Sequence, residues 1–459
     1  MKKSAVLAAC ALGAMACGAD PGVEDVVFSQ DAASLQATVT YTLTGDEPAI
    51  VTLDVLTNGV SVGAANIRSL VGDVNRMVQP GARTILWRPD KSWPGHHLTD
   101  GEVTVAVKAW PESDPPDYMM IDISLGSQTI PAADRVTYYE CADAIPFPGG
   151  VTNDLCKTDY LVMRRCHATG VPVRIGTSAE EHWADSRWTP HYVTLTNDFW
   201  IGVYEVTQRQ YQHFCGSTNS FATPSYFTAD AATRPVENIA MYDLRGWSND
   251  DDGGVKVSKG TRKLWPETGH EILPYDCTGQ YGHNHTNILW LVRQITGMDF
   301  DLPTDAQWEI AARAGKGGNL PDGTAYYKTV NGESGLDRVR RYARFFKNSQ
   351  IVGNANTNEW PAAEGGTAKV GSYLPNAWGL YDVCGNVAEL CLDNYDIFTT
   401  ASAIDPLGPA TPLRQNSSRV LRGGSWMNET WEVEVSERRS QGNNNRGKHV
   451  GFRLCLTIP

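Results

Sequence analysis

The sequence is short of positive charge and of long apolar segments, and both shortages limit what the protein can do. Its 459 residues carry 39 lysines and arginines against 52 aspartates and glutamates, which gives a formal net charge of −13. An acidic chain repels phosphate backbones and anionic lipid headgroups, so nucleic acid is not an expected partner. After the first twenty residues no apolar run approaches the length of about 20 residues that a membrane-spanning helix needs, so no membrane span is expected.

Several chemical signatures are missing as well. The sequence has no C-x-x-C pair, which counts against a structural zinc ribbon and against a thioredoxin-like redox site. It also has no G-x-S-x-G elbow, phosphate-binding loop or dinucleotide fingerprint. Hydrolase and nucleotide-dependent chemistry therefore have no basis in its motifs.

The amino terminus has the pattern of an export signal. Two lysines precede a short apolar stretch that ends in Ala14-Met15-Ala16, which is the order of parts in a secretory signal peptide. We expect residues 1–16 to be removed and the protein to be exported to the periplasm, the cell surface or the medium. Cys17 would then be the first residue, which leaves a lipid anchor at Cys17 and plain secretion as two alternatives.

Residues 26–125 show the alternation of β-strands. Apolar and polar side chains alternate along residues 35–44, 51–55 and 103–109, which is typical of strands with one buried face. This pattern predicts a small β-sandwich that resembles immunoglobulin modules, although the Cys…Trp…Cys spacing of true immunoglobulin domains is missing. No chemistry is visible in this domain, and we expect it to serve as a spacer or in adhesion.

The rest of the chain predicts a second, α+β domain. Residues 126–160 follow a stretch rich in proline and continue it, so they are interpreted as a connector. From residue 161 to 459, short strands and a few helices alternate with long loops rich in glycine, asparagine and tryptophan. Thr207 and Thr304 are each followed three residues later by a glutamine, and this capping-box spacing predicts that a helix begins at each.

Six segments of the second domain carry recognisable motifs. They are Phe199 to Thr207, Arg234 to Asn238, Leu302 to Glu309, Asn376 to Glu389, Arg422-Gly423-Gly424-Ser425-Trp426 and Gly451-Phe452-Arg453. Their residues and their order resemble the formylglycine-generating enzyme family, also called the sulfatase-modifying factor family. The resemblance covers residues 161–459 and implies a loop-rich fold related to C-type lectins.

The resemblance also argues against the activity for which the family is best known. Formylglycine-generating enzymes oxidise a cysteine of exported sulfatases, using copper held by two cysteines that follow the Gly-Gly-Ser motif. Cu(I) prefers thiolate ligands, but here the first cysteine position falls on Asn428 and the second falls near Val433. Copper is therefore not expected, and neither is conversion of cysteine to formylglycine.

A structural calcium site is a second implication of the resemblance. Family members bind calcium through one side chain, two backbone carbonyls and a glutamate, and these roles fall on Asp382, Gly385, Val387 and Glu389. Carboxylate and carbonyl oxygens are the hard ligands that Ca²⁺ prefers. A tight Gly-Asn turn without metal is the alternative.

The segments around the missing cysteines predict a ligand-binding cleft. The residues expected to line it are Ser425, Trp426, Asn428, Trp431 and Arg439. Aromatic faces beside amide and guanidinium donors suit a peptide, protein or glycan ligand better than redox chemistry. We therefore expect a non-catalytic binding module. The alternative is an oxidoreductase of the same family that acts on an exported protein with a non-standard active site, for which Ser425 and Arg439 are the candidates.

Family topology also bears on the cysteines. Export to an oxidising compartment permits disulfides, and the family places Cys455 near the core that holds the calcium segment, which Cys384 and Cys391 flank. We expect at least one of Cys384 and Cys391 to be bridged, with its partner among these three cysteines. The spacing of the cysteines does not choose the pairing.

Overall fold

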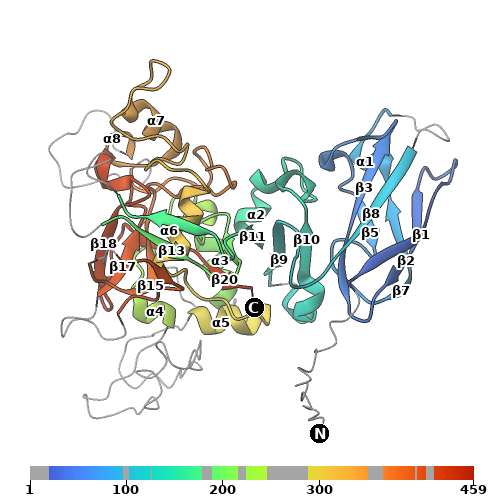
Figure 1. The fold of residues 1–459 in the computed structure, drawn as a ribbon, viewed down its shortest axis with the longest axis horizontal. Coiled ribbons are helices and arrows are strands. Elements are labelled where there is room, and N and C mark those ends of the chain that lie inside the picture. Colours follow the sequence, from blue (N-terminus) through green and yellow to red (C-terminus); the bar gives the residue numbers. More distant parts are fainter. Residues whose placement is uncertain are drawn as a thin grey trace, which may run out of the picture. The chain divides into compact units, whose positions relative to one another are not determined.

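The chain folds into two units, which Figure 1 shows in a computed structural model. The structure describes residues 20–96, 103–125, 127–177, 189–215, 224–245, 288–349, 365–397, 401–409 and 418–458. The first unit ends at Pro115 and the second begins at Pro116. The predicted signal peptide and Cys17 lie outside the described residues. In the ranges above, no helix has both the length and the apolar character to cross a membrane.

The first unit contains two antiparallel sheets. One sheet has the strand order β1-β2-β7-β5, and the other has the order β4-β3-β6, with β8 also paired to β3. The strands are β1 (Gly22–Gln30), β2 (Ala37–Thr44), β3 (Ala49–Thr57), β4 (Val60–Ser61), β5 (Leu70–Gly72), β6 (Met77–Val78), β7 (Gly81–Trp87) and β8 (Val103–Trp110). The short helix α1 (Pro89–Ser92) follows β7.

The core of this unit follows from the alternation in the sequence. Val39, Tyr41 and Leu43 of β2 are buried, whereas the threonines between them are more exposed. They share one apolar cluster with Val51 of β3 and Trp87 of β7, which belong to different sheets. Because side chains alternate between the two faces of a strand, each sheet presents its apolar face to this common core.

The second unit mixes helices with three sheets. The sheets have the strand orders β10-β9-β11-β14-β20, β12-β13-β16 and β18-β17-β15-β19. The strands are β9 (Tyr118–Asp122), β10 (Val136–Tyr139), β11 (Tyr160–Cys166), β12 (Pro172–Ile175), β13 (His191–Thr194), β14 (Phe199–Gly202), β15 (Ala388–Asn394), β16 (Ala403–Ile404), β17 (Ser418–Arg422), β18 (Arg438–Gly442), β19 (Val450–Gly451) and β20 (Cys455–Thr457). The α-helices are α2 (Leu155–Thr158), α3 (Gln208–Cys215), α4 (Met241–Arg245), α5 (Ile288–Thr296), α6 (Asp305–Arg313), α7 (Gly335–Tyr342) and α8 (Phe346–Ser349).

The segment interpreted as a connector is part of the second unit. Strand β10, which lies in this segment, pairs with β9, which lies in the range predicted for the sandwich, and β9 also pairs with β11 of the same sheet. Met119, Ile121 and Ile123 are buried in the core cluster of this unit. The boundary predicted near residue 126 is therefore wrong, and it lies at Pro115–Pro116. Prolines precede and follow this stretch, but the continuous apolar run Tyr118-Met119-Met120-Ile121 forms the buried strand β9, which pairs with β11.

Both predicted capping boxes are present. At the start of α6 the Thr304 hydroxyl accepts a hydrogen bond from the Gln307 amide, and the Gln307 side chain accepts one from the Thr304 amide. Thr207 and Gln210 make the same reciprocal pair at the start of α3, with distances of 3.0 and 3.2 Å. Each box satisfies backbone donors that the first turn of a helix leaves unpaired.

Candidate functional site

Four of the residues predicted to line a cleft lie between β17 and β18, and the fifth, Arg439, lies in β18. Gly423 and Gly424, which follow β17, both have positive φ angles, of 78° and 65°. A Cβ atom at Gly424 would lie 2.2 Å from the carbonyl oxygen of Glu432. Only glycine permits this backbone conformation together with so close an approach. The Gly-Gly pair thus turns the chain so that Ser425 and Trp426 are packed beside the segment around Glu432.

A continuous chain of polar contacts joins the candidate residues. The Ser425 hydroxyl donates to Asn428 Oδ1 at 2.6 Å, and Asn428 Nδ2 donates to Glu432 Oε2 at 3.2 Å. The Arg439 guanidinium forms an ion pair with Glu432 and donates through Nε to Glu437 at 3.2 Å. The structure therefore brings Ser425, Asn428 and Arg439 together. We call Ser425, Asn428, Glu432 and Arg439 the Ser425–Arg439 cluster.

Glu432 is the member of this cluster that the sequence interpretation missed. Its Oε2 accepts the Glu429 amide at 2.7 Å, and the Glu429 side chain accepts the Glu432 amide, which is a capping box at the start of the short 3₁₀ turn Thr430–Val433. The sequence carried no usual capping-box signal for it, because the N-cap residue is Glu429 and not a serine, threonine, aspartate or asparagine. Glu432 matters because it is the contact that links Asn428 to Arg439.

The predicted cleft is only partly at the surface. Trp431 is 40% exposed, and the Arg439 side chain is also 40% exposed. Ser425 and Trp426 are fully buried. The prediction is therefore wrong for these two side chains, because Trp426 packs edge-on against Phe227 with ring centroids 5.2 Å apart. The outward-facing part of the site consists of Trp431, Arg439 and the adjacent Met427.

The chemistry of the cluster does not favour a nucleophile. A serine hydroxyl needs a base that takes its proton before it can attack a substrate. Here the Ser425 hydroxyl donates to Asn428, whose amide is neutral and takes no proton. In the part of the chain that the structure describes, the cluster therefore lacks an activated serine.

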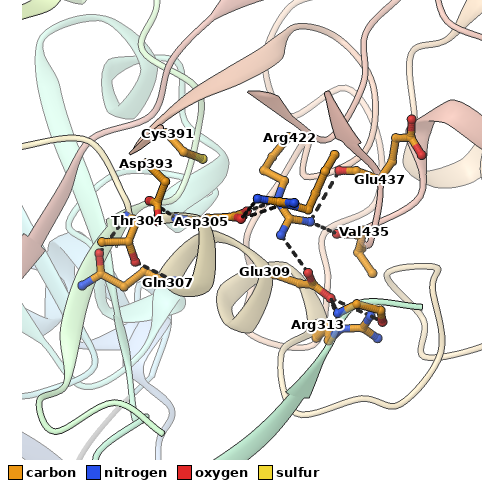
Figure 2. A network of polar contacts seen from close by, with 12 residues as sticks. Thr304, Asp305, Gln307, Glu309, Arg313, Cys391, Asp393, Arg422, Val435 and Glu437 are labelled. Atoms are coloured by element: carbon orange, nitrogen blue, oxygen red, sulfur yellow. Dashed lines mark hydrogen bonds and ion pairs between the residues drawn. The ribbon is translucent and has the colours of Figure 1, made fainter. Parts of the chain in front are cut away.

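A buried ion-pair network fixes the segment that leads into the cluster (Figure 2). Arg422, the residue before Gly423, pairs with Asp305 and, at 2.8 Å, with Glu309, both on α6. Arg438 of β18 also pairs with Asp305, at 2.7 Å, and Arg313 pairs with Glu309, at 2.7 Å. Burial alone would raise the pKa of both carboxyl groups, but the charges of these guanidinium groups hold them below their usual values. The network ties α6 to β17 and β18.

The four residues predicted to hold calcium precede or begin β15. Asp382 is buried, and its Oδ2 accepts the Gly371 amide at 2.6 Å. Its Oδ1 is buried with no hydrogen-bond partner among the described residues. Both oxygens of Glu389 are engaged: Trp308 Nε1 donates to Oε2 at 2.7 Å, and Arg453 forms an ion pair with Oε1 at 2.7 Å.

These contacts fit a calcium ion at Asp382 better than at Glu389. Burial raises the pKa of Asp382 to about 6, and the Glu389 charge adds to that effect. An unpaired, buried carboxylate oxygen is a group that a hard cation would satisfy. Among the described residues no three His, Cys, Asp or Glu side chains are arranged to hold a metal. The backbone carbonyls of Gly385 and Val387 would therefore have to complete the site.

A second buried acid beside this segment was not predicted. Glu205 is fully buried, and its carboxyl accepts hydrogen bonds from Asn386 Nδ2 at 2.6 Å and from the Val387 amide at 3.0 Å. Burial, together with the charges of Asp382 and Glu389, raises its pKa well above the usual value. Glu205 belongs to the motif Phe199 to Thr207, but nothing in that motif indicated which distant segment it contacts.

The predicted disulfide is not formed. The described cysteines are all free: Cys141, Cys156, Cys166, Cys215, Cys384, Cys391 and Cys455. Cys384, Cys391 and Cys455 lie in one apolar core cluster, where burial raises the pKa of each thiol well above its usual value. The prediction is therefore wrong for these three residues, because each thiol is packed as a small apolar side chain.

Comparison with known proteins identifies the family of the second unit. Residues 165–458 match the family described as Sulfatase-modifying factor enzyme 1-like domain. The chain is 30% identical over 281 residues to Chaperone protein LppX of Paenibacillus barcinonensis, which covers 59% of this chain and 83% of that protein. It is 31% identical over 307 residues to the Formylglycine-generating enzyme of Thermomonospora curvata, covering 63% of this chain and 92% of the enzyme. Among solved structures, Treponema denticola variable protein 1 is 26% identical and has a TM-score of 0.41, covering 65% of this chain and 95% of that protein.

Proposed function

The chain belongs to the sulfatase-modifying factor family, and from this premise we propose that it is an exported, non-catalytic binding protein for a peptide, protein or glycan. The observation that carries the proposal is Asn428. It stands at the first copper-cysteine position of the family and is hydrogen-bonded to Ser425 and Glu432. An amide held in this way offers no soft donor to Cu(I) and no thiolate to a substrate.

The exposed part of the Ser425–Arg439 cluster supports binding. Trp431 and Met427 present apolar surface, and the Arg439 guanidinium has more donors than its contacts with Glu432 and Glu437 use. Tryptophan and arginine are the residue types that contribute most to protein interfaces. One relative is named as a chaperone, which is consistent with a polypeptide as the ligand.

The proposal has three further parts: the sandwich, the lectin relation and export. The two antiparallel sheets of the first unit, with their shared core, support an immunoglobulin-like sandwich. A C-type-lectin relation of the second unit rests on the family resemblance. The signal-peptide pattern at residues 1–16 supports export to the periplasm, the cell surface or the medium, either secreted or anchored through lipid at Cys17.

We also propose structural calcium at Asp382, Gly385, Val387 and Glu389. The unpaired Asp382 Oδ1 supports it, since the bound ion would supply the missing partner. In this proposal Asp382 and Glu389 contribute carboxylate oxygens, and Gly385 and Val387 contribute backbone carbonyls. The ion would stabilise the loop that leads into β15 and would take no part in chemistry.

Selection of ligands tests the binding proposal. A random heptapeptide library displayed on phage is panned against the native protein, and a glycan array is probed in parallel. Trp431→Ala/Arg439→Ala should lose at least about tenfold in affinity for any selected ligand, since two interface anchors are removed. Arg340→Ala, at an exposed position on α7, is the matched control and should bind like the native protein. Equal binding by all three proteins would show that the cluster is not the ligand site.

The alternative is an oxidoreductase with a non-standard active site, and family membership is the observation that favours it. The mature protein is incubated with copper, a reductant and a peptide containing Cys-x-Pro-x-Arg, and the peptide mass is measured. We expect no change, while a formylglycine-generating enzyme treated in the same way should replace the thiol with an aldehyde. If this protein lowers the mass of the peptide by the amount expected for conversion of the thiol to the aldehyde, the oxidoreductase is established in place of the binding module.

A further inference from the structure

Lys448 is held by aromatic rings. Its Nζ lies 5.3 Å from the centroid of the Tyr226 ring and 5.6 Å from that of the Trp426 ring. Both distances are within the range in which an ammonium is attracted to the face of a ring. Within the described part of the chain, the ammonium has no hydrogen bond and no ion pair. Its three N–H donors are therefore not used by a protein acceptor in these ranges.

The rings around this ammonium are firmly placed. Phe227 packs edge-on against Tyr226, with centroids 5.1 Å apart, and edge-on against Trp426, with centroids 5.2 Å apart. Trp426 Nε1 also donates to the backbone carbonyl of Lys448 at 3.0 Å. The backbone of Lys448 and the rings thus form one packed unit, and the ammonium at the end of the long Lys448 side chain faces two of these rings.

A buried acidic residue lies next to the segment that carries these rings. Glu237 is fully buried, and its Oε1 accepts the Tyr226 amide at 2.6 Å and the Phe227 amide at 2.9 Å. Its Oε2 is buried without a hydrogen-bond partner among the described residues. Burial raises the pKa of Glu237 to about 7, and the Lys448 charge is one of those that oppose this rise. Glu237 is thus hydrogen-bonded to the backbone of the residue whose ring faces the Lys448 ammonium.

We propose that Tyr226, Trp426 and Glu237 form an ammonium site that Lys448 fills in the free protein, and that a lysine side chain of a protein partner occupies it by displacing Lys448. The inference rests on the binding function proposed above and names the chemistry of its partner. Tyr226 is 54% exposed, so the site opens to solvent on the side of that ring. The attraction of an ammonium to rings does not depend on the chain that carries it.

Two features favour a basic partner over an acidic one. The chain has a net charge of −13, which draws positively charged surfaces toward it. The ammonium site itself combines two ring faces with an acid, and the negative faces of the rings, together with Glu237 when it is ionised, disfavour a carboxylate or phosphate ligand. Lys448 is then an internal competitor, so removing its ammonium should raise the affinity for an external one.

Calorimetric titration with a blocked pentapeptide, Gly-Ala-Lys-Ala-Gly, tests the inference on the full mature protein. Lys448→Ala should bind the peptide at least about fivefold more tightly than the native protein, the size of effect that one cation–π contact supports. Lys448→Arg keeps an internal cation and should bind like the native protein. The double variant Lys448→Ala/Tyr226→Leu should lose this increase in peptide affinity, because one of the two rings is removed. Lys347→Ala, which removes another partly exposed lysine on α8, is the control, and thermal melting of each variant checks its fold.

The outcomes separate this inference from the proposed function. Equal peptide affinity of the native protein and Lys448→Ala would overturn the ammonium site, and so would an equal gain with norleucine in place of the peptide lysine. Ligands selected on phage that respond to Trp431→Ala/Arg439→Ala but not to the Lys448 variants would leave the proposed function standing without this site. Peptide binding that follows the Lys448 and Tyr226 variants, with no ligand selected at the cluster, would support the ammonium site and reject the Ser425–Arg439 cluster as the ligand site.

Discussion

Arg453 and Glu389 form a doubly hydrogen-bonded ion pair in the interior of the second unit. Arg453 Nη2 lies 2.7 Å from Glu389 Oε1, and Nε donates to Oε2 at 3.0 Å, while both side chains are almost fully buried. Arg453 Nη1 also donates to the carbonyls of Gly202 and Val203. The charge of Glu389 is therefore compensated by the protein itself, and Asp382 is the carboxylate of the predicted calcium segment that has an unpaired oxygen.

Calcium should raise the melting temperature of the native protein by about 2 °C or more over excess chelator, because an ion that binds only the folded state stabilises it. Asp382→Ala should lose this response, whereas Asp382→Asn should keep part of it, since an amide oxygen is still a ligand. Asn also tolerates the positive φ of 57° at this position. Identical melting temperatures in excess calcium and in excess chelator would show that the segment holds no calcium.

Alkylation should divide the cysteines by burial. Cys141 is exposed, so it should react with iodoacetamide in the native state, whereas buried Cys384, Cys391 and Cys455 should not. Burial raises the pKa of these three thiols well above the usual value, which leaves almost no reactive thiolate. In urea without reductant all three should become alkylated, as free thiols do. Peptide mapping checks this, and a fragment that stays unmodified until reductant is added would show that the cysteine is bridged.

Loss of Arg422 should destabilise the second unit strongly. Arg422→Met removes the guanidinium that pairs with both Asp305 and Glu309, and we expect the free energy of unfolding to fall by about 3 to 5 kcal/mol, since buried carboxylates lose a counter-charge. Urea unfolding followed by tryptophan fluorescence measures the change. Arg340→Met is the control: it removes an exposed ion pair with Asp337, and the free energy of unfolding should fall by about 0.5 kcal/mol or less. Similar losses for the two variants would contradict the role given to the network.

Asp198 should make the second unit sensitive to acid. Burial would raise the pKa of this carboxyl, but hydrogen bonds from Thr169, Ala168 and Arg165 outweigh it and lower the pKa from 3.8 to about 2. Because the pKa is lower in the folded state, the stabilisation is present above about pH 4 and is lost as the pH falls toward 2, amounting to about 2 kcal/mol.

Urea unfolding between pH 7 and pH 2 checks the role of Asp198. The difference in stability between the native protein and Asp198→Asn should shrink across the window from pH 4 to pH 2. Asp299→Asn, at a highly exposed side chain, should follow the native curve throughout. A difference between the native protein and Asp198→Asn that stays constant with pH would refute the assignment.

The sequence by itself determined the features that depend on neighbouring residues. Alternation along residues 35–44 predicted β2, and the spacing of Thr304 and Gln307 predicted the start of α6. These patterns are local, because a strand has a period of two residues and a capping box spans one turn of helix. The motifs also identified the family, and the resemblance implies that Asn428 stands at a copper-ligand position.

Only the tertiary structure decided which distant groups meet. Glu205 contacts Val387, Arg453 pairs with Glu389, and Lys448 reaches Tyr226, although long stretches of chain separate each pair. Such contacts depend on how sheets and loops pack. Packing also buried Trp426, joined β9 to the second unit, and enclosed the cysteines in an apolar core. Local spacing carries no information about these contacts, because burial and pairing are set by surfaces that exist only once the chain has folded.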